Sequence, residues 1–183
     1  LADLHSVDPA AVSLGDLGHP EGFVERQLAG WNKRWLAAKD QDLPEIDQII
    51  PWLENNLPKS DNVTLLHNDF KLDNMLVNSD DPAQPSAVLD WDMCTLGDPL
   101  MDLGHMLNYW TDSTDDVEWR STVTMPTWRE GFPTRKDVVA RYAERTGFDV
   151  SAVNWYFVFG SFKLAVILQQ IYIRYLRGQT KDE

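Results

Sequence analysis

A polar segment stands between two apolar runs in the stretch LLHNDFKLDNMLV at residues 65–77. Short apolar runs of this kind predict buried strands, and a loop between such strands presents its side chains at the edge of a rigid frame. A third apolar run, ending at Leu89, leads directly into Asp90. If the runs pair, Asp69, Asn74 and Asp90 converge at one end of the predicted hairpin region.

The side chains of this segment are suited to a hard cation. Carboxylate and amide oxygens, without cysteine ligands, favour an ion such as Mg²⁺. One further carboxylate that is free of metal could accept the proton of an alcohol during phosphoryl transfer. Composition alone leaves a second interpretation open, in which the Asp and Asn residues form turns and His67 is a hydrogen-bonded core histidine.

Three motifs, read in order, resemble those of a known family. The pattern H-x-D-x-x-x-x-N at 67–74, followed by Asp90, resembles the catalytic and metal loops of the protein-kinase fold. Together with VLDWD at 88–92 and GDPLMDL at 97–103, it looks most like the aminoglycoside phosphotransferase and choline kinase family. Within that family, EGFVERQL at 21–28 and IYIRYLRG at 171–178 resemble the phosphotransferase group related to the kinase-like region of some acyl-CoA dehydrogenase family proteins. The resemblance covers nearly the whole chain.

The resemblance implies a role for each residue of the motifs. Asp69 would be the catalytic base, Asn74 and Asp90 would bind Mg²⁺, and His67 would brace the loop. Asp102 would hold backbone N–H groups of the catalytic loop. ATP would be the co-substrate.

Three other polar residues near the motifs have more than one possible role. Lys71 matches a position that can contact the transferred phosphate, and the alternative is a solvent-facing lysine. Asp98 precedes Pro99, which predicts a helix cap. Asp92 could reach a second metal ion or remain a solvated carboxylate.

The resemblance is to a carboxy-terminal lobe only. We expect residues 1–183 to form one domain, the carboxy-terminal lobe of a protein-kinase-like fold. A glycine-rich phosphate loop and a strand lysine are missing from the sequence ahead of residue 67. We therefore expect the amino-terminal lobe that binds ATP to belong to the same protein outside this segment, and the isolated segment to be inactive. Only seven residues separate Asp90 from Asp98, too few for a long activation loop, which favours a small-molecule kinase over a regulated protein kinase.

The periodicity predicts an α+β fold that is predominantly helical. Val24, Leu28, Trp31 and Trp35 recur at helical spacing, and Pro44 opens a second helix in which Pro51 weakens the expected continuity. Helices are also expected over 99–110, from 134 or 137 to 147, and from 149 or 151 to 177, the last buried on most of its circumference. Residues 111–133 are expected to be irregular, and the tryptophan-rich segment 109–132 could cradle a cationic or acyl-type substrate.

Composition limits the partners and the compartment. The net charge of −13 argues against nucleic acid and anionic membranes as partners. The apolar stretch 152–173 is interrupted by polar residues, whereas a membrane span needs about 20 nearly continuous apolar residues. The single cysteine, Cys94, excludes an internal disulfide and suits a reducing cytoplasm.

The sequence therefore predicts the lobe of an ATP-dependent kinase that phosphorylates a hydroxyl group of a small molecule. Aminoglycoside-like and hydroxyacyl-type acceptors remain equally open. The alternative function is a non-catalytic, pseudokinase-like scaffold that binds a partner.

Overall fold

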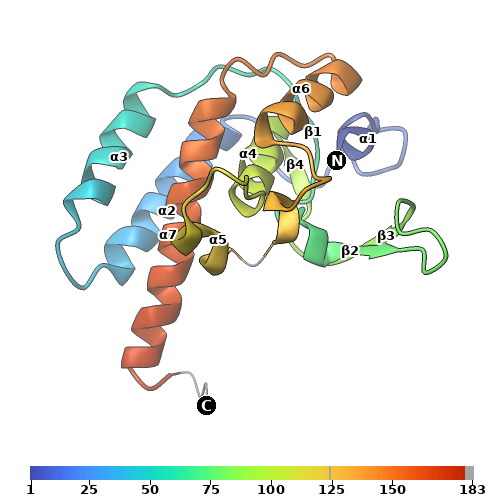
Figure 1. Cartoon of the computed structure of the whole chain (residues 1–183). Coiled ribbons are helices and arrows are strands. Elements are labelled where there is room, and N and C mark those ends of the chain that lie inside the picture. Colours follow the sequence, from blue (N-terminus) through green and yellow to red (C-terminus); the bar gives the residue numbers. More distant parts are fainter. Residues whose placement is uncertain (124, 180–183) are drawn as a thin grey trace.

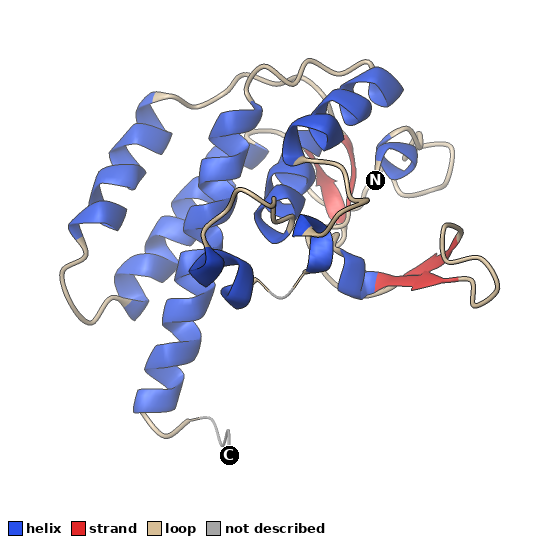
Figure 2. Ribbon diagram, in the orientation of Figure 1, coloured by secondary structure: helices blue, strands red, loops and turns tan. Residues whose placement is uncertain are grey.

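The long helix α7 (Val153–Leu176) runs through the middle of the molecule (Figures 1 and 2). The structure, a computed structural model, describes residues 1–123 and 125–179. α7 lies against α4 (Pro99–Tyr109), α2 (Phe23–Ala38) and α3 (Pro44–Asn55). The smaller helical elements are α1 (Ala2–His5), η1 (Leu72–Asn74), α5 (Val117–Thr122), η2 (Pro126–Trp128) and α6 (Arg135–Thr146). The predicted α+β class with predominant helix is confirmed.

Two small antiparallel sheets frame the polar segment. β1 (Thr64–Leu66) pairs with β4 (Thr95–Gly97), and β2 (Met75–Val77) pairs with β3 (Pro85–Val88). The second pair is the predicted hairpin, whereas the sequence reasoning had no strand at 95–97. Loop 67–74 joins β1 to β2, and loop 89–94 joins β3 to β4. Because β1 pairs with β4 and β2 pairs with β3, the two loops must run side by side.

The core is formed where α2 and α4 meet α7. The predicted stripe of α2 is buried as expected, with Trp35 fully enclosed. Two glycines let α4 and α7 approach closely: a Cβ atom on Gly104 would lie 2.5 Å from the backbone of Tyr156, and one on Gly160 would lie 2.4 Å from the Asn108 amide. The backbones of the two helices therefore touch where larger residues would separate them.

The start of α4 confirms the predicted cap. The Asp98 carboxylate accepts a hydrogen bond of 2.9 Å from the backbone N–H of Leu100, and Pro99 occupies the first helical position. Tyr156 of α7 donates its hydroxyl to the same carboxylate. The cap therefore also ties α4 to α7, and this contact fixes the helix that carries Asp102.

The predicted helix that begins at Pro44 is confirmed, and α3 is continuous through Pro51, which lies on the exposed side while Ile50 and Leu53 turn inward. Two other predictions about helices need correction. The segment 111–133 is not wholly irregular, since it contains α5 and η2.

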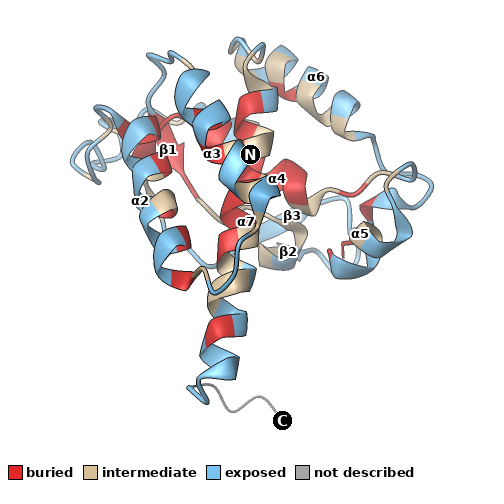
Figure 3. Ribbon diagram, turned by 90° about the vertical axis from the view of Figure 1, so that its left-hand side faces the viewer, coloured by how far each residue is buried: buried red, intermediate tan, exposed pale blue. Residues whose placement is uncertain are grey.

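The second correction concerns α7, which is buried as predicted only in its first half. By length and composition it is long and apolar enough to cross a membrane. Its first half is packed into the core, but from Leu168 onward much of its apolar surface is exposed, and this end extends beyond the other helices (Figure 3).

Candidate active site

The catalytic loop begins where β1 ends, and a buried histidine joins it to the neighbouring loop. The ring of His67 is fully buried, and its Nδ1 accepts a hydrogen bond of 3.2 Å from the backbone N–H of Asp69. The ring proton therefore sits on Nε2, which donates to the backbone oxygen of Leu89 at 2.8 Å. His67 thereby fixes the spacing between Asp69 and the segment that leads to Asp90, which is the bracing position that the resemblance implies.

Asp102 holds the same loop from the side of α4. Its carboxylate accepts two hydrogen bonds of 2.6 Å, from the backbone N–H groups of His67 and Asn68. Asn68 has a φ of 65°, a left-handed conformation that asparagine tolerates better than most residues. Two charge-assisted bonds to successive amides hold this unusual turn in place. The structure thus places Asp102 against the backbone that the sequence reasoning assigned to it.

The Asp102 oxygen that accepts from the His67 backbone, Oδ2, also contacts the side chain of His5. His5 Nε2 lies 3.3 Å from Asp102 Oδ2, and His5 Nδ1 lies 2.6 Å from the hydroxyl of Tyr142 on α6. These contacts connect α1, α4 and α6 beneath the catalytic loop. The loop is therefore supported by a buried polar network rather than by a single residue.

Asp69 is half-buried, and the two oxygens of its carboxylate have different surroundings. Oδ2 accepts a bond of 2.9 Å from the Asn74 amide and lies 2.8 Å from Lys71 Nζ. Oδ1 lies 3.8 Å from His105 Nε2, which is too long for a hydrogen bond. One oxygen is therefore anchored, and the other makes no hydrogen bond among the described residues.

Lys71 faces Asp69, so the alternative prediction of a solvent-facing lysine is wrong. Burial by itself lowers the pKa of the Lys71 ammonium, but the hydrogen bond and charge of Asp69 outweigh this effect and raise the pKa above its usual value. The ammonium also lies 5.1 Å from the centre of the Tyr109 ring. Lys71 is therefore a fixed positive charge beside the proposed base.

Asn74 is oriented so that its carboxamide oxygen is the free end. The amide nitrogen donates to both the backbone oxygen and Oδ2 of Asp69, at 2.8 and 2.9 Å. The backbone oxygen of Asn74 accepts from the backbone N–H of Leu89 at 2.8 Å, which places Asn74 next to the residue that precedes Asp90. The structure thus brings Asp69, Asn74 and the Asp90 segment together.

Asp90 is exposed and adopts a φ of 64°, two residues after the end of β3. A hydrogen bond and the negative charge of Asp92, followed by weak burial and the charge of Asp69, raise the pKa of the Asp90 carboxyl above its usual value. The Asp90 carboxylate and the Asn74 amide oxygen form a set of hard oxygen donors, and the neighbouring carboxylates of Asp92 and Asp69 add negative charge. This set fits Mg²⁺, which is usually held by one or two carboxylates while phosphates and water complete its coordination.

The protein supplies only a few ligands at this position. In the described ranges 1–123 and 125–179, no group of three or more His, Cys, Asp and Glu side chains is arranged to hold a metal ion. Asn74 and Asp90 would therefore hold Mg²⁺ only together with the phosphate groups of a nucleotide.

We expect Mg²⁺ to lower the pKa of the Asp90 carboxyl. Without metal, the hydrogen bond with Asp92 and then repulsion from its charge stabilise the protonated form of Asp90 and raise its pKa; a bound cation stabilises the charged form and reverses the shift. Carboxyl carbon NMR during a pH titration of a longer protein that contains both this chain and an ATP-binding lobe, with Mg²⁺ and ATP present or absent, measures this change. An Asp90 pKa that is unaffected by Mg²⁺ and ATP would contradict its assignment as a metal ligand, and the exposed Asp80 serves as the control carboxyl.

Two residues of the site were missed by the sequence reasoning. His105 lies one helical turn after Asp102, and this spacing could have indicated that both face the catalytic loop. Burial first, and then the charges of Lys163 and Lys71, hold the His105 pKa well below its usual value, so the ring is neutral. Lys163 of α7 had been noted only as an interruption of an apolar run; its Nζ lies 3.4 Å from the backbone oxygen of Asn68.

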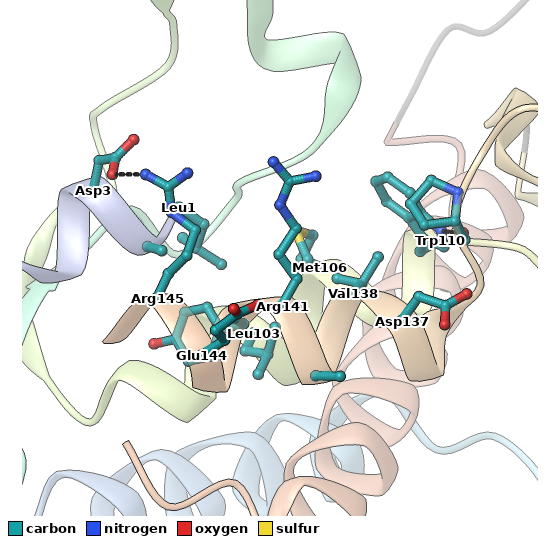
Figure 4. A pocket seen from close by; sticks show the side chains of 14 residues that line it. Leu1, Asp3, Leu103, Met106, Trp110, Asp137, Val138, Arg141, Glu144 and Arg145 are labelled. Atoms are coloured by element: carbon teal, nitrogen blue, oxygen red, sulfur yellow. Dashed lines mark hydrogen bonds and ion pairs between the residues drawn. The ribbon is translucent and has the colours of Figure 1, made fainter. Parts of the chain in front are cut away.

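A large cavity lies away from the catalytic loop. It has a volume of about 1110 Å³ and opens between α1, α4 and α6, with Arg141 and Arg145 along one rim (Figure 4). It contains none of Asp69, Asn74 or Asp90. We therefore place the candidate site at the catalytic loop, where the polar groups converge, and not in this cavity.

Comparison with known proteins agrees with this geometry. The family model described as "Phosphotransferase enzyme family" matches residues 1–143. The chain belongs to this family. A solved structure from Ralstonia eutropha, provisionally named an aminoglycoside phosphotransferase, superposes with a TM-score of 0.83 at 29% identity, over 99% of this chain and 55% of that chain. These matches confirm the phosphotransferase resemblance and the kinase-like fold.

The curated relatives of this chain are much longer proteins. Acyl-CoA dehydrogenase family member 11 from Rattus norvegicus is 37% identical over the whole chain, which spans 24% of that relative. Acyl-CoA dehydrogenase family member 10 from Mus musculus is 35% identical, and the chain spans 17% of it. The chain therefore corresponds to less than a quarter of the length of these relatives, and the resemblance to the acyl-CoA dehydrogenase-related group is confirmed.

Proposed function

We propose that the chain is the catalytic lobe of a small-molecule kinase that transfers the γ-phosphate of ATP to a hydroxyl group. The observation that carries this proposal is the asymmetric setting of Asp69. Lys71 and Asn74 donate hydrogen bonds to one carboxylate oxygen, and the other oxygen makes no hydrogen bond among the described residues. A base in phosphoryl transfer needs such an oxygen for the proton of the attacking hydroxyl.

The remaining residues would position the phosphates. Asn74 and Asp90 would hold Mg²⁺, which would neutralise charge on the nucleotide. Lys71 would add a positive charge next to the transferred group while it anchors Asp69. His67 and Asp102 touch no substrate in this proposal; they hold the loop in the required shape.

Nucleotide binding would depend on more than this lobe. The chain contributes the base and the metal ligands, whereas the phosphate-covering elements of a kinase lie in the other lobe. We propose that the chain acts in a longer cytoplasmic protein that supplies this amino-terminal lobe, and we refer to it below as the longer protein.

We expect residues 1–183 alone to turn over little or no ATP. The test compares ADP formation by this chain and by the longer protein, with Mg²⁺ present and after its removal by a chelator. Activity of the longer protein that disappears with Mg²⁺ is the expected result. Robust ATP turnover by residues 1–183 would contradict the division of roles between the lobes, and an inactive longer protein would favour the scaffold function.

A further inference from the structure

A second cavity adjoins the catalytic loop at Asn68. It has a volume of about 410 Å³ and lies between α2, the loop before α2, and the side chains of Asn68 and Lys163. Its lining includes four basic residues and no Asp or Glu. The lining residues are Gly18, His19, Phe23, Arg26, Gln27, Trp31, Arg34, Asn68, Met93, Thr95 and Lys163.

This charge is unusual for the molecule. The chain carries a net charge of −13, and carboxylates line other cavities, such as the one between α1, α4 and α6 and one bounded by Glu21, Glu25 and Asp61. A random stretch of this surface would therefore be acidic. A cavity without carboxylates concentrates positive potential where the rest of the surface repels anions.

Lys163 is the most deeply placed of the three cations of this lining, Arg26, Arg34 and Lys163. Its residue is only 8% exposed, and its Nζ makes a single long hydrogen bond of 3.4 Å, to the backbone oxygen of Asn68. No carboxylate of a described residue lies within ion-pair distance. Burial first lowers the pKa of Lys163 to about 8, with Arg34 and Lys71 adding to the shift while Asp102 and Asp69 oppose it.

A buried ammonium with one weak partner costs stability, because it has lost its hydration without a matching anion. A methionine of similar length would fill the same space without this cost. The ammonium is therefore better explained by a ligand than by packing.

Arg34 is the second cation available to a ligand. Its guanidinium carbon lies 4.3 Å from the centre of the Trp31 ring, and Lys163 Nζ lies 5.4 Å from the same centre. Arg26, by contrast, already donates to the backbone oxygens of Glu21 and His19 and shapes the loop. Arg34 and Lys163 thus both contact the Trp31 ring. Among the described residues the Arg34 side chain donates no hydrogen bond and Lys163 donates only one, so both have donors left for an oxyanion.

We infer that this cavity binds an anionic group, a phosphate or a carboxylate, of the hydroxyl acceptor, with Lys163 and Arg34 as its ligands. The inference rests on the proposed kinase function. Asn68 lines the cavity and immediately precedes Asp69, and successive Cα atoms are about 3.8 Å apart. An acceptor anchored in the cavity therefore needs to reach only past this residue to present its hydroxyl to the base. Cationic acceptors such as aminoglycosides would be repelled.

The binding step can be tested with simple anions. Titration of the chain with pyrophosphate, and separately with succinate, is followed by calorimetry without divalent cations, so that no metal–phosphate site contributes. We expect saturable binding that Lys163→Met and Arg34→Gln each weaken at least tenfold. Lys33→Met is the matched control, because Lys33 is an exposed neighbour on α2 that does not line the cavity, and it should change affinity less than twofold.

The outcomes separate the possible anions. Tighter binding of pyrophosphate assigns a phosphate group, and tighter binding of succinate assigns a carboxylate. Binding of neither anion, or binding that both variants leave unchanged, overturns the inference. Arg34 is exposed, so Arg34→Gln remains informative even if Lys163→Met fails to fold.

A second measurement assigns the anion to the acceptor. In the longer protein, Lys163→Met should raise the KM for an anionic acceptor at least tenfold and leave the KM for Mg·ATP unchanged. The reverse pattern would mean that the cavity binds the nucleotide, and it would overturn the assignment. Asp69→Asn keeps the two proposals distinct: if it leaves turnover intact while Lys163→Met still abolishes pyrophosphate binding, the kinase proposal fails and the anion site stands.

Discussion

Asp69→Asn in the longer protein is expected to lower the rate of phosphoryl transfer about 10²–10⁴-fold, the usual contribution of a positioned base. The substitution preserves the shape of the side chain and one oxygen acceptor, but an amide cannot take the proton of the attacking hydroxyl. Asn74 and Lys71 contact the oxygen that is anchored and not the free one. Single-turnover measurement of ADP formation isolates this step from product release.

Asp73→Asn is the matched control for this experiment. Asp73 lies in the same loop and is exposed. Its substitution makes the same change from a carboxylate to an amide and leaves Asp69 in place. We expect its rate to stay within about twofold of the unmodified protein, as for most surface substitutions. Equal rates for Asp69→Asn and Asp73→Asn would remove Asp69 from the reaction.

Asp102→Ala is expected to destabilise the chain by about 3–5 kcal/mol, because hydrogen bonds to a charged group contribute about 1.5–3 kcal/mol each. The change leaves the buried N–H groups of His67 and Asn68 without their acceptor, and it removes the partner of His5. A loss of this size is a large part of the 5–15 kcal/mol typical of a folded domain. Urea unfolding monitored by tryptophan fluorescence measures it.

Asp116→Ala provides the comparison for Asp102→Ala. Asp116 is exposed at the start of α5, and its side chain makes no capping hydrogen bond. Its removal should change the free energy of unfolding by less than about 0.5 kcal/mol. A similar small change for Asp102→Ala would show that the buried network does not hold the catalytic loop.

The helices could be predicted well because their signals are local. The spacing of Val24, Leu28 and Trp35 places one apolar face on α2, and all three are buried. Asp98 followed by Pro99 specifies the start of α4 within two residues. Such patterns depend on a few neighbours in the sequence and not on the rest of the fold.

β4 was missed because its signal is not local. Thr95–Gly97 is three residues long and ends in glycine, which has low strand propensity. It forms a strand because it pairs with β1, about thirty residues earlier, and because Gly97 fits against Phe23 and Leu66 without a side chain. Only the folded chain brings these groups together.

The candidate site divides in the same way. Asp69 and Asn74 are five residues apart in one loop, so their contact could be predicted from the sequence. Asp90 was expected to join them through strand pairing, and the contact between Leu89 and Asn74 places its segment there. Lys163 reaches the loop from a helix 95 residues away, and a single lysine in an apolar run gives no sign of that approach.

Titration of the longer protein with Mg·ATP, for the Asp69→Asn and Asp90→Asn variants, tests the central assignment most directly. A base is not required for nucleotide binding, whereas a charged metal ligand is, because Asp90→Asn removes a hard anionic oxygen from Mg²⁺. The account predicts that Asp69→Asn binds Mg·ATP like the unmodified protein and that Asp90→Asn binds it at least tenfold more weakly. The opposite pattern, with binding lost in Asp69→Asn and intact in Asp90→Asn, would contradict it.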